Sequence, residues 1–263
     1  MRMLLGLIRT TGGSGSVLGR PSGDSSALRR VGAVIETPAF YPYLSGRDNL
    51  RVVAMHAGVA SSSIASVLDR VGLATRARNR FSTYSLGMKQ RLGLASALLK
   101  APELLILDEP SNGLDPVGIA ELRTLLRTLA GEGKTIFLSS HQLGEVEQVC
   151  DRVGVIFRGR LVMEGALAEI RGGAGLVVVA NPLDAAEERL RAQFGTEMVT
   201  VRGDELHLAI DPSQSAAVTR DLFMAGIEVR EVRRSERTLE EVFLSMNQTF
   251  GEAEPRDRLG EAK

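Results

Sequence analysis

Hydrophobic and polar positions follow two different periods along the first 160 residues. Four short apolar runs predict strands, at Val31–Ile35, Leu104–Leu107, Thr135–Ser139 and Val153–Phe157. Between most of them, apolar residues recur at spacings of three and four, which predicts helices over residues 92–99, 119–129 and 143–149. Strands that are apolar throughout and alternate with helices are typical of a parallel sheet covered on both faces. The pattern therefore predicts an α/β fold here.

The segment from Ser45 to Tyr84 has no strand pattern. Ser45–Asp48 indicates a helix start, because serine is a favoured N-cap residue, and residues 61–71 have the spacing of a second short helix. We therefore expect a helical subdomain over about residues 45–100, inserted into an α/β domain that spans residues 1–170.

The pattern changes after Arg158-Gly159-Arg160, which predicts a turn between two strands. From Leu176 the order is strand, helix, strand, strand, helix, strand, at residues 176–180, 184–194, 198–202, 205–210, 213–225 and 228–232. This β-α-β-β-α-β order predicts a small ferredoxin-like α+β domain over residues 176–247. We expect a linker at Gly172–Gly175, a last helix at Leu239–Met246 and a disordered polar tail over residues 251–263.

Composition narrows the possible functions. The 263 residues carry 32 Lys and Arg against 32 Asp and Glu, so no net charge favours non-specific nucleic-acid binding. A single cysteine, Cys150, cannot form an internal disulfide, which fits a reducing compartment. The longest apolar run, Met3–Ile8, is far shorter than the roughly 18 residues that suggest a membrane span.

Two carboxylates follow a predicted buried strand. Asp108 ends the strand that begins at Leu104, and Glu109 comes next, at the sheet edge where ligands bind. Asp108 is suited to hold Mg²⁺ through water, because Mg²⁺ keeps most of its hydration shell. Glu109 is suited to orient and deprotonate an attacking water. Taken alone, the pair also fits two solvated acids before a turn at Pro110.

Ser85 and Gly87 lie where a helix is expected to begin. A hydroxyl, backbone N–H groups and the positive end of the helix converge there on a point suited to an anion. A plain N-cap explains Ser85 equally well. Gly87 inside the first turn costs up to about 1 kcal/mol relative to alanine, and either the approach of a phosphate or close packing accounts for it.

These motifs together resemble the ATP-binding cassette (ABC) ATPases. Tyr84-Ser-Leu-Gly-Met88 resembles a variant of their Leu-Ser-Gly-Gly-Gln signature, Leu104–Glu109 their Walker B strand, Asn112–Asp115 their D-loop, and His141 their switch histidine. Order and spacing agree over residues 1 to about 165. The variant signature resembles that of exporters for antibiotics and lantibiotic peptides, and Thr238–Leu244 resembles a C-terminal motif of drug-resistance members.

The resemblance implies a P-loop NTPase-type core that binds ATP and Mg²⁺ at the interface of a homodimer. It places Ser85, Gly87, Met88 and Asp115 among the ATP-binding residues, with the signature closing over the ATP of the opposite subunit. His141 then contacts the γ-phosphate and the water held by Glu109.

Glu36 stands where the family usually has glutamine. Its carboxylate can still approach Mg²⁺ through water, beside Asp108. The loop from Glu36 to Tyr43, with aromatic residues Phe40, Tyr41 and Tyr43, is expected to receive a membrane permease subunit. The alternative is a small satellite core under this loop. The resemblance implies a cytoplasmic location, peripheral on the inner face of the cell membrane.

The chain has no Gly-x-x-x-x-Gly-Lys-Ser/Thr phosphate loop. Gly133-Lys134-Thr135 mimics its end, but position 128 is threonine, and the order is helix, loop, strand; Gly131 and Gly133 instead predict a helix stop. Residues 12–16 lack a lysine and predict a turn. Met1–Ile8 resembles the helix that follows the phosphate loop in the family. We therefore expect the protein to start upstream, with this chain assigned from an internal methionine; the alternative is that the gene has decayed.

The sequence therefore predicts the ATP-hydrolysing subunit of an ABC exporter for a drug, antibiotic or peptide. One alternative is a truncated, inactive fragment with a binding role or none. A soluble, non-transport ABC ATPase fits less well, since those usually carry two cassettes or a long coiled-coil insertion. The transported substrate is set by the membrane partner.

Overall fold

The computed structural model describes residues 1–36, 38–171, 174–236 and 238–244. The chain divides into two compact units, Met1–Gln142 and Leu143–Lys263.

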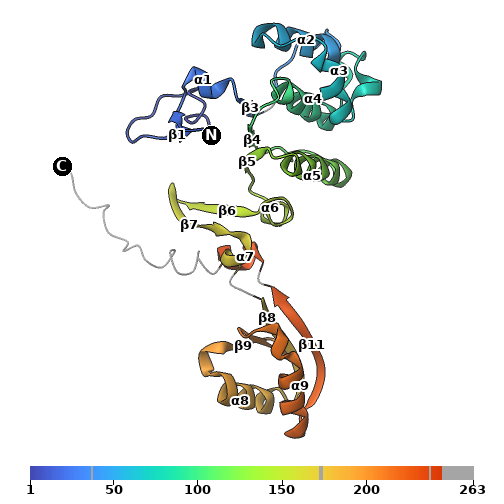
Figure 1. The fold of residues 1–263 in the computed structure, drawn as a ribbon. Coiled ribbons are helices and arrows are strands. Elements are labelled where there is room, and N and C mark those ends of the chain that lie inside the picture. The colour runs from blue at the N-terminus through green and yellow to red at the C-terminus, as the bar shows by residue number, and fades with distance from the viewer. Residues whose placement is uncertain (37, 172–173, 237, 245–263) are drawn as a thin grey trace, which may run out of the picture. The chain divides into compact units, whose positions relative to one another are not determined.

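A three-stranded parallel sheet forms the centre of the first unit (Figure 1). Its order is β3 (Val31–Val34), β4 (Leu104–Asp108), β5 (Thr135–Ser139), and these three strands are parallel, as predicted. In the central strand, Leu105, Ile106 and Leu107 are at most 1% exposed. Among the described residues β5 is an edge strand, and Phe137 on it is 48% exposed.

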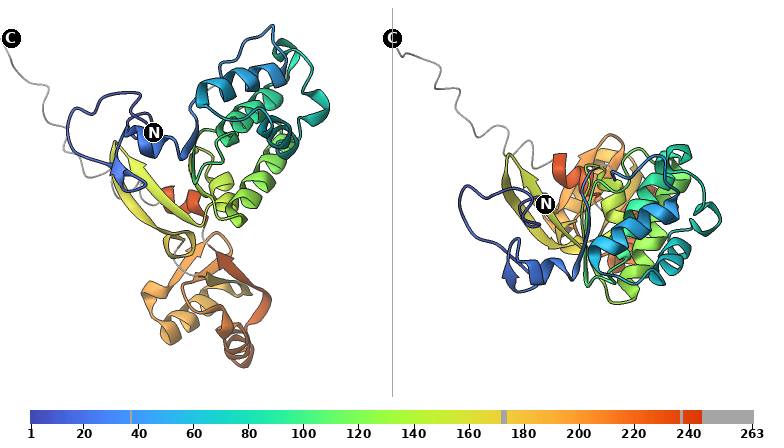
Figure 2. Two further views of the ribbon diagram at one scale, coloured as in Figure 1. Left: turned by 45° about the horizontal axis from the view of Figure 1, so that its top comes forward. Right: turned by 90° about the horizontal axis from the view of Figure 1, so that it is seen from above.

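Four helices lie to one side of this sheet in both views (Figures 1 and 2). They are α2 (Gly46–Ala57), α3 (Ser63–Arg70), α4 (Leu86–Leu98) and α5 (Pro116–Gly131), with 3₁₀ turns at Ala74–Arg76 and Phe81–Thr83. No described strand interrupts residues 46–98, so this stretch is helical as expected; its standing as a separate subdomain remains a prediction. The Ser45 hydroxyl caps α2 by accepting the Asp48 N–H at 3.1 Å. Gly133 at φ +85° follows the end of α5, which confirms the predicted helix stop.

The N-terminal segment covers the other face of β3 and β4. It contains β1 (Ser16–Val17), β2 (Arg20–Pro21) and α1 (Ser25–Leu28), and its Leu5 and Val17 pack with Val31 and Ile106. The expected helix at Met1–Ile8 is wrong, because these residues form turns. Gly6 adopts φ +69° against Gly23, and so short an isolated helix would be marginal.

The second unit begins with α6 (Leu143–Val149), β6 (Arg152–Phe157), β7 (Arg160–Ala166) and α7 (Leu167–Ile170). The turn between β6 and β7 is confirmed, with Arg158 and Gly159 both at positive φ. However, β6 pairs antiparallel with β7 and does not belong to the parallel sheet, contrary to the prediction. A two-residue connection can join only antiparallel strands, and alternate β6 residues are exposed.

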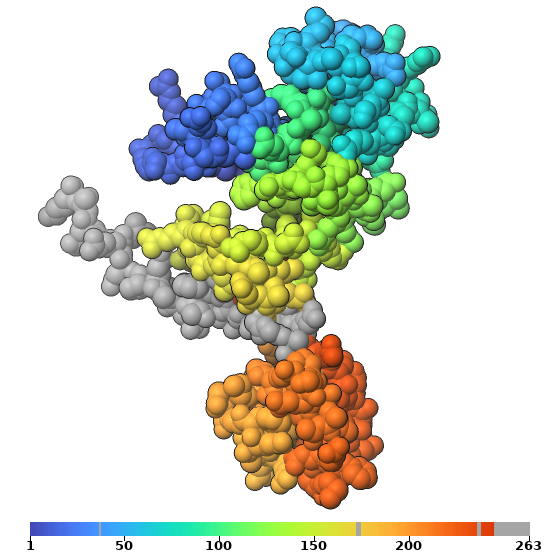
Figure 3. Space-filling view, viewed as in Figure 1, coloured from blue at the N-terminus to red at the C-terminus, as the bar shows by residue number. Residues whose placement is uncertain are grey.

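The remainder of the second unit has the predicted ferredoxin-like topology. Its elements are β8 (Ala174–Asn181), α8 (Leu183–Phe194), β9 (Val199–Arg202), β10 (Glu205–Leu208), α9 (Ser215–Met224) and β11 (Glu228–Glu236), with 3₁₀ turns at Thr196–Met198 and Pro212–Gln214. Neighbouring strands are antiparallel in the order β11-β8-β10-β9. One sheet face packs on the helices through residues such as Leu176, Val178, Leu190 and Leu222. These elements form the orange-to-red body in Figure 3.

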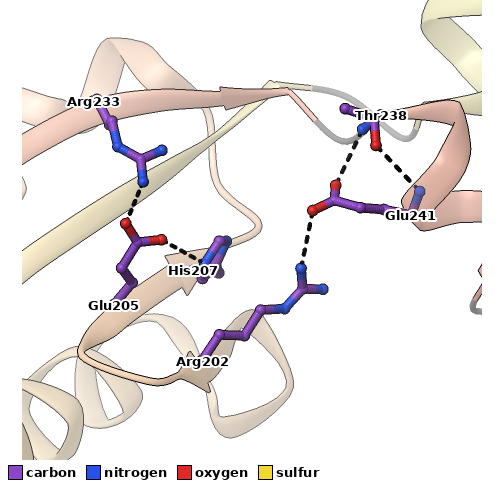
Figure 4. A network of polar contacts seen from close by, with 6 residues as sticks. All are labelled: Arg202, Glu205, His207, Arg233, Thr238 and Glu241. Carbon is purple, nitrogen blue, oxygen red and sulfur yellow. Dashed lines mark hydrogen bonds and ion pairs between the residues drawn. The ribbon is translucent and has the colours of Figure 1, made fainter. Parts of the chain in front are cut away.

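Polar side chains close the other face of this sheet (Figure 4). Glu205 forms an ion pair with Arg233 and contacts His207, whose Nε2 lies 3.2 Å from the carboxylate. His207 and Arg233 flank Val177 in register on neighbouring strands, and Val177 is 0% exposed. This network therefore covers an apolar residue on the face that the helices leave open.

A capping box begins the last described helix, residues 239–244. The Glu241 N–H donates to the Thr238 hydroxyl at 3.2 Å, and the Glu241 carboxylate accepts the Thr238 N–H at 3.1 Å. Arg202 of β9 donates to the same carboxylate at 3.3 Å (Figure 4). Leu239 and Val242 of this helix pack in one cluster with Val146 of α6. The predicted extension to Met246 and the tail lie outside the described residues.

The predicted linker at Gly172–Gly175 is wrong in its second half. Ala174 and Gly175 belong to β8, while residues 172–173 lie outside the described part. A Cβ on Gly175 would lie 2.4 Å from the Leu208 carbonyl oxygen, so close strand packing explains this glycine. The predicted division into domains 1–170 and 176–247 remains a prediction; the compact units part at residue 142, because α6 and α7 share a core with Leu239 and Val242.

Candidate active site

The ends of β4 and β5 bring the predicted acids together. Asp108 is the last residue of β4 and pairs in register with Ser139, the last residue of β5. The Ser139 hydroxyl donates to Asp108 Oδ1 at 2.5 Å and accepts the Glu109 N–H at 3.1 Å. One serine therefore holds both acidic residues in place. Sequence reasoning missed Ser139, although its place at the end of the strand next to Asp108 was an available signal.

Glu109 leaves β4 in an unusual backbone conformation. Its φ is +48°, in the left-handed region that costs a non-glycine residue about 1–3 kcal/mol. The Ser139 hydroxyl holds its N–H, and its carbonyl accepts the Asn112 N–H at 3.1 Å. The side chain then reaches His141, whose Nδ1 lies 2.9 Å from Glu109 Oε2. Ser139 thus joins Asp108 to Glu109, and the Glu109 carboxylate in turn contacts His141; the catalytic roles of Glu109 and His141 remain predictions.

The donor set at this edge suits a hydrated Mg²⁺ ion. The described residues contain no cluster of three or more His, Cys, Asp or Glu side chains able to cage a metal. Mg²⁺ is usually held by one or two carboxylates together with waters and substrate phosphates, so Asp108 alone fits this mode. Glu36 is 65% exposed at its side chain and forms an ion pair with Arg2. Its place as a second metal-binding carboxylate remains a prediction.

The signature segment begins α4. Ser85 is its N-cap and accepts the Met88 N–H at 3.3 Å, so the capping role is present. A Cβ on Gly87 would lie at an ordinary 3.5 Å from Leu114. Packing within the chain therefore does not require glycine at this position, and the approach of a phosphate to Gly87 remains a prediction.

The signature and the D-loop lie against each other in the same chain. A Cβ on Gly113 would lie 2.4 Å from the Leu86 side chain. Asp115 is the N-cap of α5 and accepts the Gly118 N–H at 2.9 Å, and its role toward a nucleotide remains a prediction. No described contact joins Ser85 or Gly87 to Asp108 or Glu109.

Tyr84 anchors the start of α4, a role that sequence reasoning missed. It is 4% exposed and donates its hydroxyl proton to the Arg76 carbonyl at 2.8 Å. Burial raises the pKa of the Tyr84 phenol, so it stays a donor across the physiological range. Its position directly before the N-cap was the only signal in the sequence.

The aromatic loop before α2 divides into a buried and an exposed part. Phe40, which is half-buried, packs edge-on against the buried Phe81, with ring centroids 5.3 Å apart. Tyr41 and Tyr43 are 50% and 66% exposed, and their rings lie 5.8 Å apart. Asn49, only 1% exposed, accepts the Tyr41 N–H at 2.8 Å and donates to the Tyr41 carbonyl at 3.0 Å. A buried amide thus holds an exposed aromatic pair.

The described helices include none that is both long and apolar enough to cross a membrane.

The central strand of the parallel sheet ends at one acid and is followed by a second, and a histidine follows the next strand. A serine-capped helix lies before them in the chain. These features together define an ABC-type ATPase subunit. The family model described as ABC transporter matches residues 1–112, and the chain belongs to this family.

Relatives and solved structures agree with this assignment. The chain is 39% identical over 250 residues to the bacitracin transport ATP-binding protein BcrA of Enterococcus faecalis, covering 92% of this chain and 81% of the relative. It is 46% identical over 164 residues to the lantibiotic transport ATP-binding protein SrtF of Streptococcus pyogenes, covering 62% and 71%. A solved ATP-binding subunit of an ABC transporter matches with 31% identity and a TM-score of 0.57, covering 65% of this chain and 73% of that one. CbiO1 of Clostridium perfringens, part of the transporter complex cbiONQ, matches with 25% identity and a TM-score of 0.57, covering 64% and 72%.

Proposed function

We propose that this chain is the ATP-hydrolysing subunit of an ABC exporter that drives efflux of an antibiotic or antibiotic-like peptide. The observation that carries the proposal is the continuous set of contacts from Asp108 through Ser139 and Glu109 to His141. The substrate class follows from the similarity to ATP-binding proteins of bacitracin and lantibiotic transport.

In this proposal Glu109 orients the attacking water and accepts its proton, since a positioned carboxylate is suited to general base catalysis. His141 holds the Glu109 carboxylate at 2.9 Å and presents its second ring nitrogen to the γ-phosphate. Mg²⁺, held at Asp108, would neutralise charge on the phosphates.

The signature of one subunit would close over the nucleotide of another. Two features support this arrangement: Gly87 has no packing reason to be glycine, and no described contact joins Ser85 to the Asp108 edge of its own chain. Exposed apolar residues at the same surface, Leu86 at 43% and Val117 at 65%, are consistent with a partner there.

The pair Tyr41 and Tyr43 is the proposed contact with a membrane permease subunit. Both rings are exposed and presented by a loop that Asn49 holds, and aromatic side chains are enriched at interfaces. This partner would place the subunit on the inner face of the cell membrane.

Phosphate binding in this family needs a strand and phosphate loop that residues 1–263 do not contain. We therefore propose that residues 1–263 alone do not hydrolyse ATP, and that a version extended by such a strand and loop does. The open edge of β5, with Phe137 48% exposed, is a suitable place for the added strand to pair.

Glu109→Gln in the extended version tests the proposed role directly. The substitution keeps the shape of the side chain but removes the base, so ATP binding should persist while turnover falls at least ~10²-fold. Glu188→Gln, an exposed glutamate on α8, is the matched control and should leave both unchanged. Turnover of the Glu109→Gln variant within a few-fold of the parent would remove Glu109 from this role.

A further inference from the structure

The second unit has an open groove of about 970 Å³ between α9 and β11. One wall comes from the helix and the other from the strand, with Thr219, Arg220 and Phe223 on the first and Glu228, Val229 and Val232 on the second. The groove is far in sequence from the acid pair of β4 and has no part in the proposed ATP hydrolysis.

Apolar side chains at this groove are unusually exposed. Phe223 of α9, which lines the groove, is 76% exposed, and Met224, next to it in the chain but outside the groove lining, is 79% exposed. On the opposite side of the same helix, Val218 and Leu222 are fully buried in the core of the domain. α9 therefore presents apolar residues both inward and outward, and an outward aromatic residue beside an apolar groove is typical of an interaction surface.

The charges on the two walls are opposite. Arg220 of the helix wall has no ion-pair partner among the described residues. Glu228 of the strand wall lies 3.8 Å from Arg230, with both side chains more than half exposed, so this pair contributes little. A second copy related by a two-fold axis, its helix wall facing the first copy's strand wall, would form the Arg220–Glu228 pair twice.

We propose that the groove between α9 and β11 is an interface with a second copy of this chain. Phe223 of each copy enters the groove of the other, and reciprocal pairs between Arg220 and Glu228 set the register. An added strand on the edge of β11 is disfavoured, because a bulge between Val229 and Glu231 and alternating charges protect that edge. This interface is independent of nucleotide, unlike the proposed closure at Ser85.

Charge reversal in residues 1–263 without nucleotide tests the interface. Sedimentation velocity should show a dimer, and Arg220→Glu or Glu228→Arg alone should weaken it at least tenfold by placing like charges opposite each other. An equimolar mixture of the two variants should restore it, since the glutamate introduced at position 220 of one copy then faces the arginine introduced at position 228 of the other. Phe223→Ser should abolish the dimer, while Glu188→Arg on the exposed face of α8 should not change it. Unchanged near-ultraviolet and far-ultraviolet circular dichroism would show that each variant is folded.

Disulfide cross-linking gives a second test, whose result does not depend on the overall size of the particles in solution. Arg220→Cys mixed with Glu228→Cys should form a cross-link under mild oxidation that neither variant forms alone, with native Cys150 present throughout as background. A parent chain that stays monomeric up to about 100 µM, a mixture that fails to restore the dimer, or the absence of the mixed cross-link would overturn the proposal. In the version extended by the phosphate loop, dimer formation only with ATP would point to the Ser85 surface instead, and would also overturn the proposal.

Discussion

Replacing Asn49 with alanine should release the aromatic loop of the first unit. Asn49 is 1% exposed, and its side chain makes hydrogen bonds of 2.8 Å and 3.0 Å to Tyr41 and of 3.1 Å to the Ser45 carbonyl. Each such bond contributes about 1 kcal/mol net, so three predict a loss of about 3 kcal/mol in the free energy of unfolding. The isosteric Asn49→Asp should cost at least as much, because it places a carboxylate against two carbonyl oxygens.

The assay combines urea unfolding with hydrogen exchange at the Tyr41 amide. Hydrogen exchange at the Tyr41 amide should accelerate in both variants. Asn49→Ala removes the oxygen that accepts this N–H, and Asn49→Asp places a carboxylate that repels the carbonyl oxygens of the loop. Arg51→Ala is the control on the same helix. Arg51 is exposed and, within the part of the chain that the structure describes, pairs with Asp48 one turn away, so its loss should cost less than about 1 kcal/mol. An Asn49→Ala variant no less stable than Arg51→Ala, with unchanged Tyr41 exchange, would refute this reasoning.

Three further predictions concern packing, pH and the signature helix. Gly93→Ala should destabilise the chain by about 1–3 kcal/mol in urea unfolding, because its Cβ would lie 2.4 Å from a proline side chain. Gly144→Ala, with open space around it, should instead stabilise the chain by up to about 1 kcal/mol. Equal effects of the two substitutions would contradict this account of the packing. The hydrogen bonds from Arg189 hold the pKa of Asp221 below its ordinary value of 3.8. Their contribution to stability is therefore fully present above pH 3.8 and is lost as the pH falls through the lowered pKa. Asp221→Asn should flatten this acid dependence in thermal melts, and an unaltered pH profile would count against the stabilising role of this pair. Tyr84→Phe should lower stability by about 1 kcal/mol through the lost hydrogen bond to the Arg76 carbonyl, while a melt identical to the parent would show that this bond contributes nothing.

Local pattern predicted most elements of the fold, because each depends on signals close in sequence. Strands β3, β4 and β5 are short apolar runs, and the ferredoxin-like order follows from alternating periods. The errors concern long-range pairing. The apolar run of β6 resembles a parallel-sheet strand, but the tight turn at Arg158–Gly159 commits it to an antiparallel hairpin. Gly175 was predicted to lie in a linker because of the glycines around it, but it is glycine because the Leu208 carbonyl of the neighbouring strand approaches it closely.

The candidate site was predictable where motifs carry the chemistry. Asp108 and Glu109 were predicted from the end of a buried strand, and His141 from the resemblance; the structure brings the three together, and their roles stay predictions. Ser139 and Asn49 were missed, because their roles arise from strand register and from burial beneath a loop, neither of which a local pattern contains. The ion pair between Arg2 and Glu36 was likewise unpredictable from residues 34 positions apart.

The most direct test of the account mixes two inactive variants of the extended version, Ser85→Arg and Glu109→Gln. If each ATP site combines Glu109 of one copy with Ser85 of the other, neither variant alone has an intact site, but every mixed dimer has one. The account predicts that the mixture hydrolyses ATP well above either variant alone, in proportion to the fraction of mixed dimers. A mixture no more active than its components would contradict the shared site.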